Sequence, residues 1–257
     1  MTLKYNKNFN EFVLVSNDAS RANEVGLTES RKTKGPNGEK VWFTDSPYAA
    51  MCFYDEADEI AQLKLKNIYE DYQSSLAVEW PYTSKLCPGD MEFMPFQNAG
   101  IDYALKRDNV LIGDAMGLGK TMIAMGIANE IGAKKVIVAC PGAVRINWQR
   151  EAKKWSILNN PTAYPILKSS DGVNPYANFI IVSYDLLRNE AILETIANMQ
   201  WDLAILDEGH YLKSVDAKRT QACFGTSERG SFHDCYLVKN ARKIVALTGT
   251  PLPNRPR

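Results

Sequence analysis

The segment GDAMGLGKT at residues 113–121 contains the residue types that bind a nucleoside triphosphate. A glycine-rich turn before a helix exposes successive backbone N–H groups at the positive end of that helix, where they can surround phosphates. Lys120 would reach the β- and γ-phosphates, and the Thr121 hydroxyl would ligate Mg²⁺. The strict pattern has glycine where Asp114 stands. A turn with an accidental lysine is the alternative, and the strand and helix patterns on either side disfavour it.

A second group of chemically capable residues follows the apolar run LAIL at residues 203–206. A phosphate-binding loop needs an acidic partner at the tip of a nearby strand to hold Mg²⁺, which predicts that role for Asp207. Glu208 would then orient and deprotonate the attacking water. An apolar strand ending in two carboxylates is common by itself. Its combination with the loop at 113–121 is far more specific than either half.

These residues lie in a region that alternates short apolar strands with helices, which predicts a parallel sheet covered on both faces. The apolar runs predict strands at residues 109–113, 135–140, 179–184, 202–206 and 243–247. Helical patterns lie between them, at residues 97–106, 120–132, 143–155 and 185–199. The last strand leads into a third run, ALTGTP at 246–251, which by itself predicts only a turn.

The first 90 residues have a different texture and predict a small α+β accessory domain, with the α/β domain at 91–257. Strands are expected at 11–16 and 40–44, and a helix from about Pro47 to Leu76. Between the strands, the turn-rich stretch at 31–40 carries four positive charges and one negative. A solvated loop explains this stretch, and a hairpin that touches DNA is the alternative.

Taken together, DAMGLGKT, DEGH and LTGTP resemble motifs I, II and III of the superfamily 2 helicase-like ATPases. The form MGLGKT is similar to the Swi/Snf branch of that superfamily, including its annealing-helicase relatives, so Asp114 is expected there. The resemblance covers residues 93 to 256 and implies the N-terminal RecA-like lobe of such an ATPase. Gly209 departs from the pattern, because the family usually has alanine or serine at this position of the DEGH box.

The resemblance assigns roles to individual residues. Lys120, Asp207, Glu208 and His210 would be catalytic, and Mg²⁺ would be held by Thr121 and Asp207. The residues implied for ATP binding are Gln97, which reads adenine in the family, and Met116, Gly117, Leu118, Gly119, Lys120 and Thr121. Motifs Ia and Ib imply DNA contacts by Pro141, Arg145, Arg150, Lys153, Ser183 and Tyr184. Thr248, Gly249 and Thr250 would couple the nucleotide state to the motor.

The function implied is that of the first motor lobe of a DNA-dependent ATPase that binds ATP, Mg²⁺ and double-stranded DNA. A strand-separating helicase is the near alternative. The family also needs a second RecA-like lobe with an arginine that reaches the γ-phosphate, and six residues after Pro251 cannot supply it. A module that binds ATP and DNA without catalysis, or that blocks a partner's motor, is therefore the alternative from another class.

Composition limits the remaining possibilities. The 257 residues include 30 Lys+Arg and 30 Asp+Glu, so the formal net charge is zero and a DNA contact must come from a local patch. No apolar run approaches the roughly 18 residues of a membrane span, and no secretory signal is evident. Five scattered cysteines read as free thiols. These features predict an intracellular protein, cytoplasmic if bacterial or phage and nuclear if eukaryotic.

Overall fold

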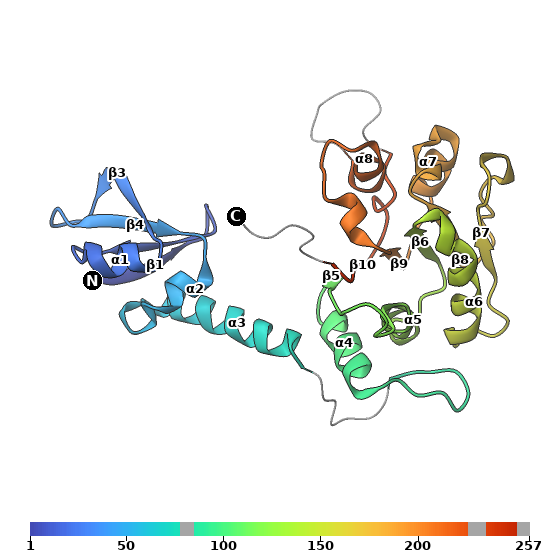
Figure 1. Ribbon diagram of the computed structural model, residues 1–257, viewed down its shortest axis with the longest axis horizontal. Helices are drawn as coiled ribbons and strands as arrows, with labels where there is room; N and C mark the ends of the chain where they lie inside the picture. Colours follow the sequence, from blue (N-terminus) through green and yellow to red (C-terminus); the bar gives the residue numbers. More distant parts are fainter. Residues whose placement is uncertain (78–84, 226–234, 251–257) are drawn as a thin grey trace. The chain divides into compact units, whose positions relative to one another are not determined.

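The computed structural model describes residues 1–77, 85–225 and 235–250, and the chain divides into two compact units (Figure 1). These units are Met1–Leu76 and Ala77–Arg257, so the boundary lies earlier than the predicted residue 90. The reason is that the segment around residue 85 bonds to the second unit. The Lys85 N–H donates to Asn98 Oδ1, and the Leu86 N–H donates to Glu130 Oε1.

The first unit contains a four-stranded antiparallel sheet in the order β1-β2-β4-β3. Its elements are β1 (Thr2–Asn6), β2 (Glu11–Val15), α1 (Ala19–Glu24), β3 (Thr28–Lys34), β4 (Lys40–Thr44), α2 (Pro47–Met51) and α3 (Glu59–Ser75). The predicted strands β2 and β4 are confirmed, and the basic stretch at 31–40 is part of the β3–β4 hairpin. Strands β1 and β3 were missed because β1 buries one residue and β3 buries none.

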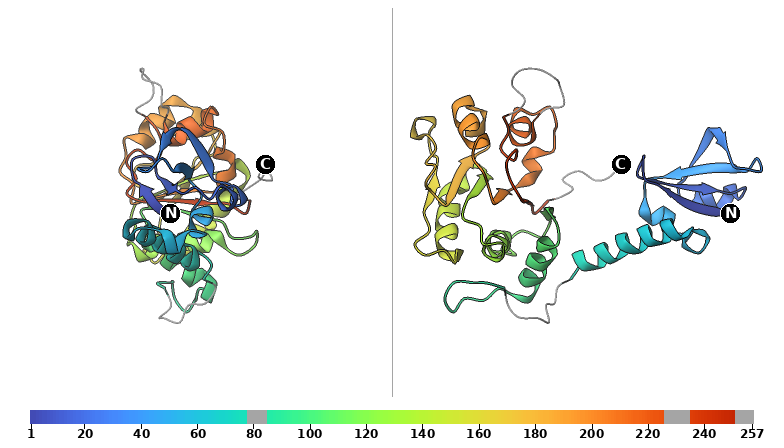
Figure 2. Two further views of the ribbon diagram at one scale, coloured as in Figure 1. Left: turned by 90° about the vertical axis from the view of Figure 1, so that its left-hand side faces the viewer. Right: turned by 180° about the vertical axis from the view of Figure 1, so that it is seen from behind.

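The predicted helix from Pro47 to Leu76 is interrupted. A short 3₁₀ turn at Tyr54–Glu56 separates α2 from α3, and the Asp58 side chain caps the start of α3. Ala61 and Leu65 of α3 are buried in the core, whereas Ile60 and Leu63 are more than half exposed. The first turns of α3 therefore pack on the sheet, and its later turns continue past the sheet (Figure 2).

The second unit contains a six-stranded sheet in the order β5-β10-β9-β6-β8-β7, and every neighbouring pair is parallel. The strands are β5 (Asn109–Ile112), β6 (Val136–Cys140), β7 (Ala163–Pro165), β8 (Phe179–Ser183), β9 (Leu203–Leu206) and β10 (Ile244–Leu247). All five predicted strands are confirmed to within one residue at each end. The sixth, β7, was missed because a three-residue strand leaves too little pattern to detect.

Helices cover both faces of this sheet, as predicted. They are α4 (Pro95–Leu105), α5 (Lys120–Glu130), α6 (Arg145–Trp155), α7 (Glu190–Ala197) and α8 (Lys218–Phe224). Alternate strand residues enter different cores: Val136 and Val138 pack with α4, α5 and α6, whereas Ile137 and Ala139 pack with α7 and α8. Figure 1 shows α7 and α8 above the sheet and α4 and α5 below it. The sheet is thereby a rigid platform for the loops at its edge.

The strand order brings the three sequence motifs together. Because all six strands are parallel, their carboxyl ends meet at one edge of the sheet. Strand β10 lies between β5 and β9. The segment after β10 therefore lies between the glycine-rich loop, which follows β5, and the acidic pair, which follows β9. The predicted DNA motifs follow β6 and β8, which are the next two strands along the same edge.

The five cysteines are free, as predicted. Burial raises the pKa of the Cys140 and Cys223 thiols to about 12, so both stay protonated and unreactive near neutral pH. In the part of the chain that the structure describes, no helix is long and apolar enough to cross a lipid bilayer.

Candidate functional site

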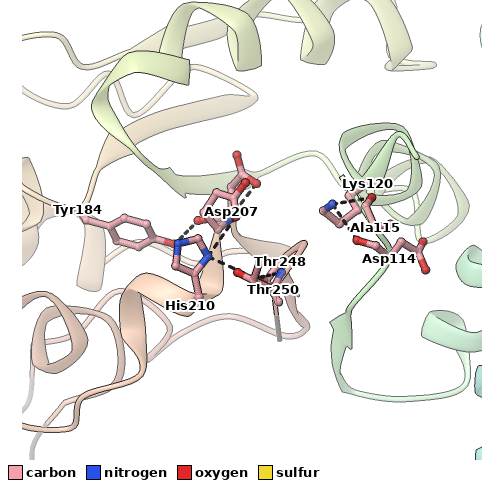
Figure 3. A network of polar contacts seen from close by, with 9 residues as sticks. Asp114, Ala115, Lys120, Tyr184, Asp207, His210, Thr248 and Thr250 are labelled. Atoms are coloured by element: carbon pink, nitrogen blue, oxygen red, sulfur yellow. Dashed lines mark hydrogen bonds and ion pairs between the residues drawn. The ribbon is translucent and has the colours of Figure 1, made fainter. Parts of the chain in front are cut away.

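The glycine-rich loop joins β5 to α5 and has the backbone of an anion-binding turn. Gly117 (φ 84°) and Gly119 (φ 76°) lie in the left-handed region, which a residue with a Cβ adopts only under strain. Helix α5 begins at Lys120, directly after Gly119. The Lys120 Nζ donates to the carbonyl oxygens of Asp114 and Ala115, at 3.0 and 3.2 Å (Figure 3). The lysine therefore lies folded over the loop whose phosphate-binding N–H groups it would assist.

Gln97 connects α4 to this loop. Its Oε1 accepts from the Met94 N–H at 3.0 Å, and its Nε2 donates to the Leu118 carbonyl at 3.2 Å. The side chain is buried, with 4% of its surface exposed. The structure thus places Gln97 against the nucleotide loop, and its reading of adenine stays a prediction.

Asp207 follows β9 and accepts three hydrogen bonds. Its Oδ2 accepts from the indole Nε1 of Trp148 at 2.7 Å, and its Oδ1 accepts from the N–H of Glu208 at 3.0 Å. Its backbone carbonyl accepts from the Tyr184 hydroxyl at 2.6 Å. Burial raises the pKa of Asp207, and the Trp148 hydrogen bond and the positive charge of Lys120 oppose that rise. A nearby cation therefore stabilises this carboxylate in its ionised form.

Glu208 adopts a backbone conformation that is uncommon for a residue with a side chain. Its φ is 50° and its ψ is 52°, in the left-handed region. Such strain concentrates at functional sites, because the surrounding structure must enforce it. The buried Glu208 Oε2 lies 3.2 Å from His210 Nδ1, yet no well-oriented hydrogen bond from a described residue satisfies it. Glu208 thus combines an unusual backbone conformation with a buried oxygen that lacks a hydrogen-bond partner among the described residues.

The segment after β10 contacts both halves of the site. The buried Thr248 Oγ1 lies 3.3 Å from His210 Nδ1 and accepts from the Thr250 N–H at 3.2 Å (Figure 3). On the other side, a Cβ added to Gly249 would lie 2.8 Å from Met116 Cγ and 3.4 Å from Lys120 Nζ. The segment therefore joins the acidic turn to the nucleotide loop, while Pro251 lies outside the described residues.

The donors at this site fit a magnesium ion. Mg²⁺ prefers carboxylate, hydroxyl and water oxygens, together with the phosphates of a nucleotide. Each Asp207 carboxylate oxygen accepts one hydrogen bond and retains a free lone pair. Among the described residues, none forms a hydrogen bond with the Thr121 hydroxyl, which therefore keeps its lone pairs.

Four of the six residues predicted to contact DNA lie after β6, in the segment that contains α6. Arg150 and Lys153 are exposed on α6, and Pro141 begins the segment after β6. Arg145 donates through Nε and Nη1 to the carbonyls of Gly142, Ile166 and Leu167, so it holds the start of α6 against a neighbouring loop. Its contact with DNA stays a prediction.

Ser183 and Tyr184 lie at the carboxyl end of β8, and each residue is only 3% exposed. The Ser183 Oγ accepts from the Leu186 N–H, and the Tyr184 hydroxyl donates to the Asp207 backbone carbonyl. Both side chains therefore have partners within the protein, and their contact with DNA stays a prediction.

Two contacts of the site were missed by sequence reasoning. Trp148, Ala152 and Trp155 are buried on one side of α6, which by itself indicates core packing. A buried indole, however, needs an acceptor for its N–H, and that requirement was the available signal. The second contact is a stack, in which the Tyr184 and Tyr211 rings lie 6.1 Å apart, with His210 4.8 Å from Tyr211.

Alanine is expected to weaken ATP binding at one motif glycine, Gly249, and to leave it unchanged at another, Gly209. Gly249→Ala is expected to weaken ATP binding by about 5- to 150-fold, because overpacking against Met116 costs about 1–3 kcal/mol. Gly209→Ala is the matched control, since its new Cβ would lie 3.6 Å from Ala246 Cβ, in ordinary contact. Calorimetric titration of both variants with Mg·ATP measures the difference. Equal affinities would contradict the close approach of Gly249 to the loop.

The part of the chain that matches a known protein family begins close to the boundary between the two units. Residues 72–257 match the family model of the SNF2-related domain. The chain belongs to this family. The SNF2-related domain therefore accounts for the second unit, which is the N-terminal RecA-like lobe of a Swi/Snf-type superfamily 2 ATPase domain. Residues 1–71 lie outside the match.

Individual relatives support this placement. The DNA annealing helicase and endonuclease ZRANB3 of Homo sapiens is 30% identical over 171 residues, which cover 64% of this chain and 15% of that protein. The SWI/SNF-related matrix-associated actin-dependent regulator of chromatin subfamily A-like protein 1 of Xenopus laevis is 32% identical over 166 residues, or 63% of this chain and 16% of that protein. The chain thus spans about one sixth of the length of these curated relatives.

A solved structure has the same fold. The Sulfolobus solfataricus SWI2/SNF2 ATPase core in complex with dsDNA aligns with a TM-score of 0.53 and 20% identity, covering 70% of this chain and 36% of that one. At this identity the likeness concerns the fold of the SNF2-related domain.

Proposed function

We propose that this SNF2-related domain binds Mg·ATP and works as the first lobe of a DNA-dependent ATPase motor. One observation carries the proposal. Three neighbouring strands, β5, β10 and β9, lead into the glycine-rich loop, a linking segment and a carboxylate pair at one edge of the sheet. The contacts of Gly249 with the loop and of Thr248 with His210 join these parts into one site.

ATP binding would use the loop backbone and Lys120. The backbone from Gly117 to Thr121 leads into the start of α5, where the helix dipole favours negative charge. The Lys120 ammonium would exchange its bonds to the loop carbonyls for the β- and γ-phosphates. Thr121 and Asp207 would hold Mg²⁺, which supplies charge neutralisation on the phosphate oxygens when bound. Gln97 would read adenine through its amide after releasing Leu118 or Met94.

Hydrolysis would use the acidic turn. The Glu208 carboxylate would accept a proton from the attacking water molecule once a change at the turn exposes its buried Oε2. His210 lies between Glu208 and Thr248 and would pass a displacement of the segment after β10 to that carboxylate. The reaction would convert ATP and water into ADP and phosphate.

Replacement of the loop lysine tests ATP binding. Lys120→Ala is expected to weaken Mg·ATP binding by about 10- to 150-fold, because a hydrogen bond to a charged group contributes about 1.5–3 kcal/mol. Lys134→Ala is the matched control, since Lys134 is exposed before β6 at the opposite edge of the sheet. Titration calorimetry compares the two variants. Unchanged affinity in Lys120→Ala would contradict a nucleotide site at this loop.

Double-stranded DNA is the second ligand that we propose. The Sulfolobus solfataricus core was solved in complex with dsDNA, and ZRANB3 is named a DNA annealing helicase. On this chain the exposed side of α6 carries Arg150, Lys153 and Lys154, on a protein whose formal net charge is zero. Such a local patch can contact successive phosphates. Strand annealing and strand separation would both begin with this contact.

Reversal of two charges tests the DNA surface. Replacing Arg150 and Lys153 with glutamate is expected to lower the slope of log affinity against log salt by about two, because about 0.9 counterion is released per phosphate contact. The control reverses the exposed Lys134 and Lys239, which precede β6 and β10 at the opposite edge. Fluorescence anisotropy with a short duplex at several salt concentrations gives the slopes. Equal slopes for both variants would place the DNA elsewhere.

A second candidate function is a module that binds ATP and DNA without turnover. The site of this lobe can hold a nucleotide by itself, whereas the family's hydrolysis depends on an arginine from a second RecA-like lobe. We propose that such a lobe is the working partner of this site. Turnover measurements with and without that lobe separate the two candidates.

A further inference from the structure

Two hydrogen bonds reach Asp207 from the segments after β6 and β8, which are the segments predicted to contact DNA. Trp148 belongs to α6, and its indole N–H donates to the carboxylate of Asp207 at 2.7 Å. Tyr184 follows β8, and its hydroxyl donates to the backbone carbonyl of Asp207 at 2.6 Å. Side chain and backbone of one residue are thus fixed from two directions, by donors that are themselves 1% and 3% exposed.

Each of these donors belongs to an element with an opposite, exposed side. On α6, Trp148 is buried, while Arg150 and Lys153 are exposed on the other side of the same helix. The two elements also approach each other before they reach Asp207, since a Cβ on Gly142, just before α6, would lie 4.0 Å from Ser183 Cβ. A ligand that shifts α6 therefore acts on a packed pair of segments.

We propose that Trp148 and Tyr184 are positioning residues that transmit DNA binding at α6 and the β8 turn to Asp207. The inference rests on the proposed function and deepens it, by naming the bonds through which one ligand affects the other. Neither side chain contacts DNA in this scheme. DNA moves the element, and the buried donor moves the carboxylate that holds the metal of Mg·ATP.

The physical basis is the rigidity of the contacts. Trp148 fills the core between α6 and the sheet, and cores are too densely packed to absorb a displacement at one point. If α6 shifts, the indole must carry Asp207 along or leave its N–H without an acceptor in a buried site, which is unfavourable. The Tyr184 ring is additionally stacked on Tyr211, which contacts His210. A displacement of the β8 turn therefore reaches Asp207, directly before Glu208, and His210, two residues after it.

The test measures how DNA changes the affinity for Mg·ATP, with the full chain and a short duplex. Binding of two coupled ligands typically changes each affinity by about 5- to 150-fold, and the factor is the same in both directions. The wild-type chain is expected to show a factor in this range. Trp148→Phe and Tyr184→Phe each remove one donor and keep a ring, so each is expected to bring the factor close to one while the affinity for DNA alone is retained.

Two matched variants control for the loss of an aromatic donor. Trp155→Phe removes an indole N–H on the same helix, one that bonds to Glu151 within α6. Tyr164 lies on β7, and Tyr164→Phe removes a hydroxyl that donates to the backbone carbonyl of Asp171. Both controls are expected to keep the wild-type factor. The two test variants act on different elements, so each checks the other where one of them folds poorly.

Four results would overturn the inference. The first is a wild-type factor in both test variants, and the second is an equal loss in the controls. The third is a wild-type chain that binds both ligands but whose affinity for Mg·ATP is not changed by DNA. That result would still agree with the proposed binding function. A loss of DNA affinity in Tyr184→Phe with an unchanged factor would make Tyr184 a direct contact and also overturn the inference. Failure of wild type to bind Mg·ATP contradicts the proposed function itself.

Discussion

Replacing Glu208 with glutamine is expected to lower DNA-stimulated ATP hydrolysis by about 10²- to 10⁴-fold, which is the usual contribution of a general base. Glutamine has nearly the same shape as glutamate but cannot accept a proton from the attacking water. Because Lys120, Thr121 and Asp207 stay in place, the affinity for Mg·ATP is expected to remain at its wild-type value. Phosphate release in the presence of a second lobe and DNA measures the first quantity, and calorimetry measures the second.

The structure supplies a control for this variant. Glu194 is exposed on α7, on the other face of the sheet, so Glu194→Gln changes the net charge equally without touching the site. Its turnover is expected to match that of wild type. If Glu208→Gln also turns over normally, the proton acceptor is another group, and the left-handed backbone at Glu208 serves only to shape the turn.

The ATPase fold could be predicted because its strands are buried on both faces. Strands β6 and β8 are continuous apolar runs, VIVAC and FIIVS, in which all five residues are buried. Such runs stand out from the polar segments between them. In the first unit the β3 segment TESRKTK carries no apolar residue, and its strand conformation depends on pairing with β4. That pairing is a tertiary contact, which a local pattern does not contain.

The candidate site could be predicted only in part, for a related reason. Local runs, in which residue type and spacing together indicate phosphate chemistry, predict the roles of Lys120 and Asp207, and the family resemblance implies that of His210. The donors that hold Asp207 lie 59 and 23 positions away from it in the sequence. Their partnership depends on the order of the strands in the sheet, and that order has no local signature. The bond from Tyr184 to Asp207 could not be predicted for the same reason, because the motif that contains Tyr184 does not specify the direction of its side chain.

The dependence of turnover on a second lobe is the other large effect that we expect. In the proposed site, Lys120, Thr121 and Asp207 would make the ground-state contacts with Mg·ATP within one lobe. Charge on the transferring phosphoryl group must be stabilised further in the transition state. A missing arginine finger typically costs about 10³–10⁵ in rate. The 257-residue chain is therefore expected to bind ATP and to hydrolyse it negligibly, even with DNA present.

Adding the second RecA-like lobe of a Swi/Snf-type ATPase, fused or in excess, is expected to restore DNA-stimulated phosphate release, and Glu208→Gln is expected to abolish it again. Restoration would show that the acidic turn of this lobe is built for catalysis. A lobe that assembles but restores nothing would favour the module that binds without turnover. Robust turnover by the 257-residue chain alone, lost in Glu208→Gln, would contradict the prediction, because a basic residue from this chain or from a second copy would then have to reach the γ-phosphate.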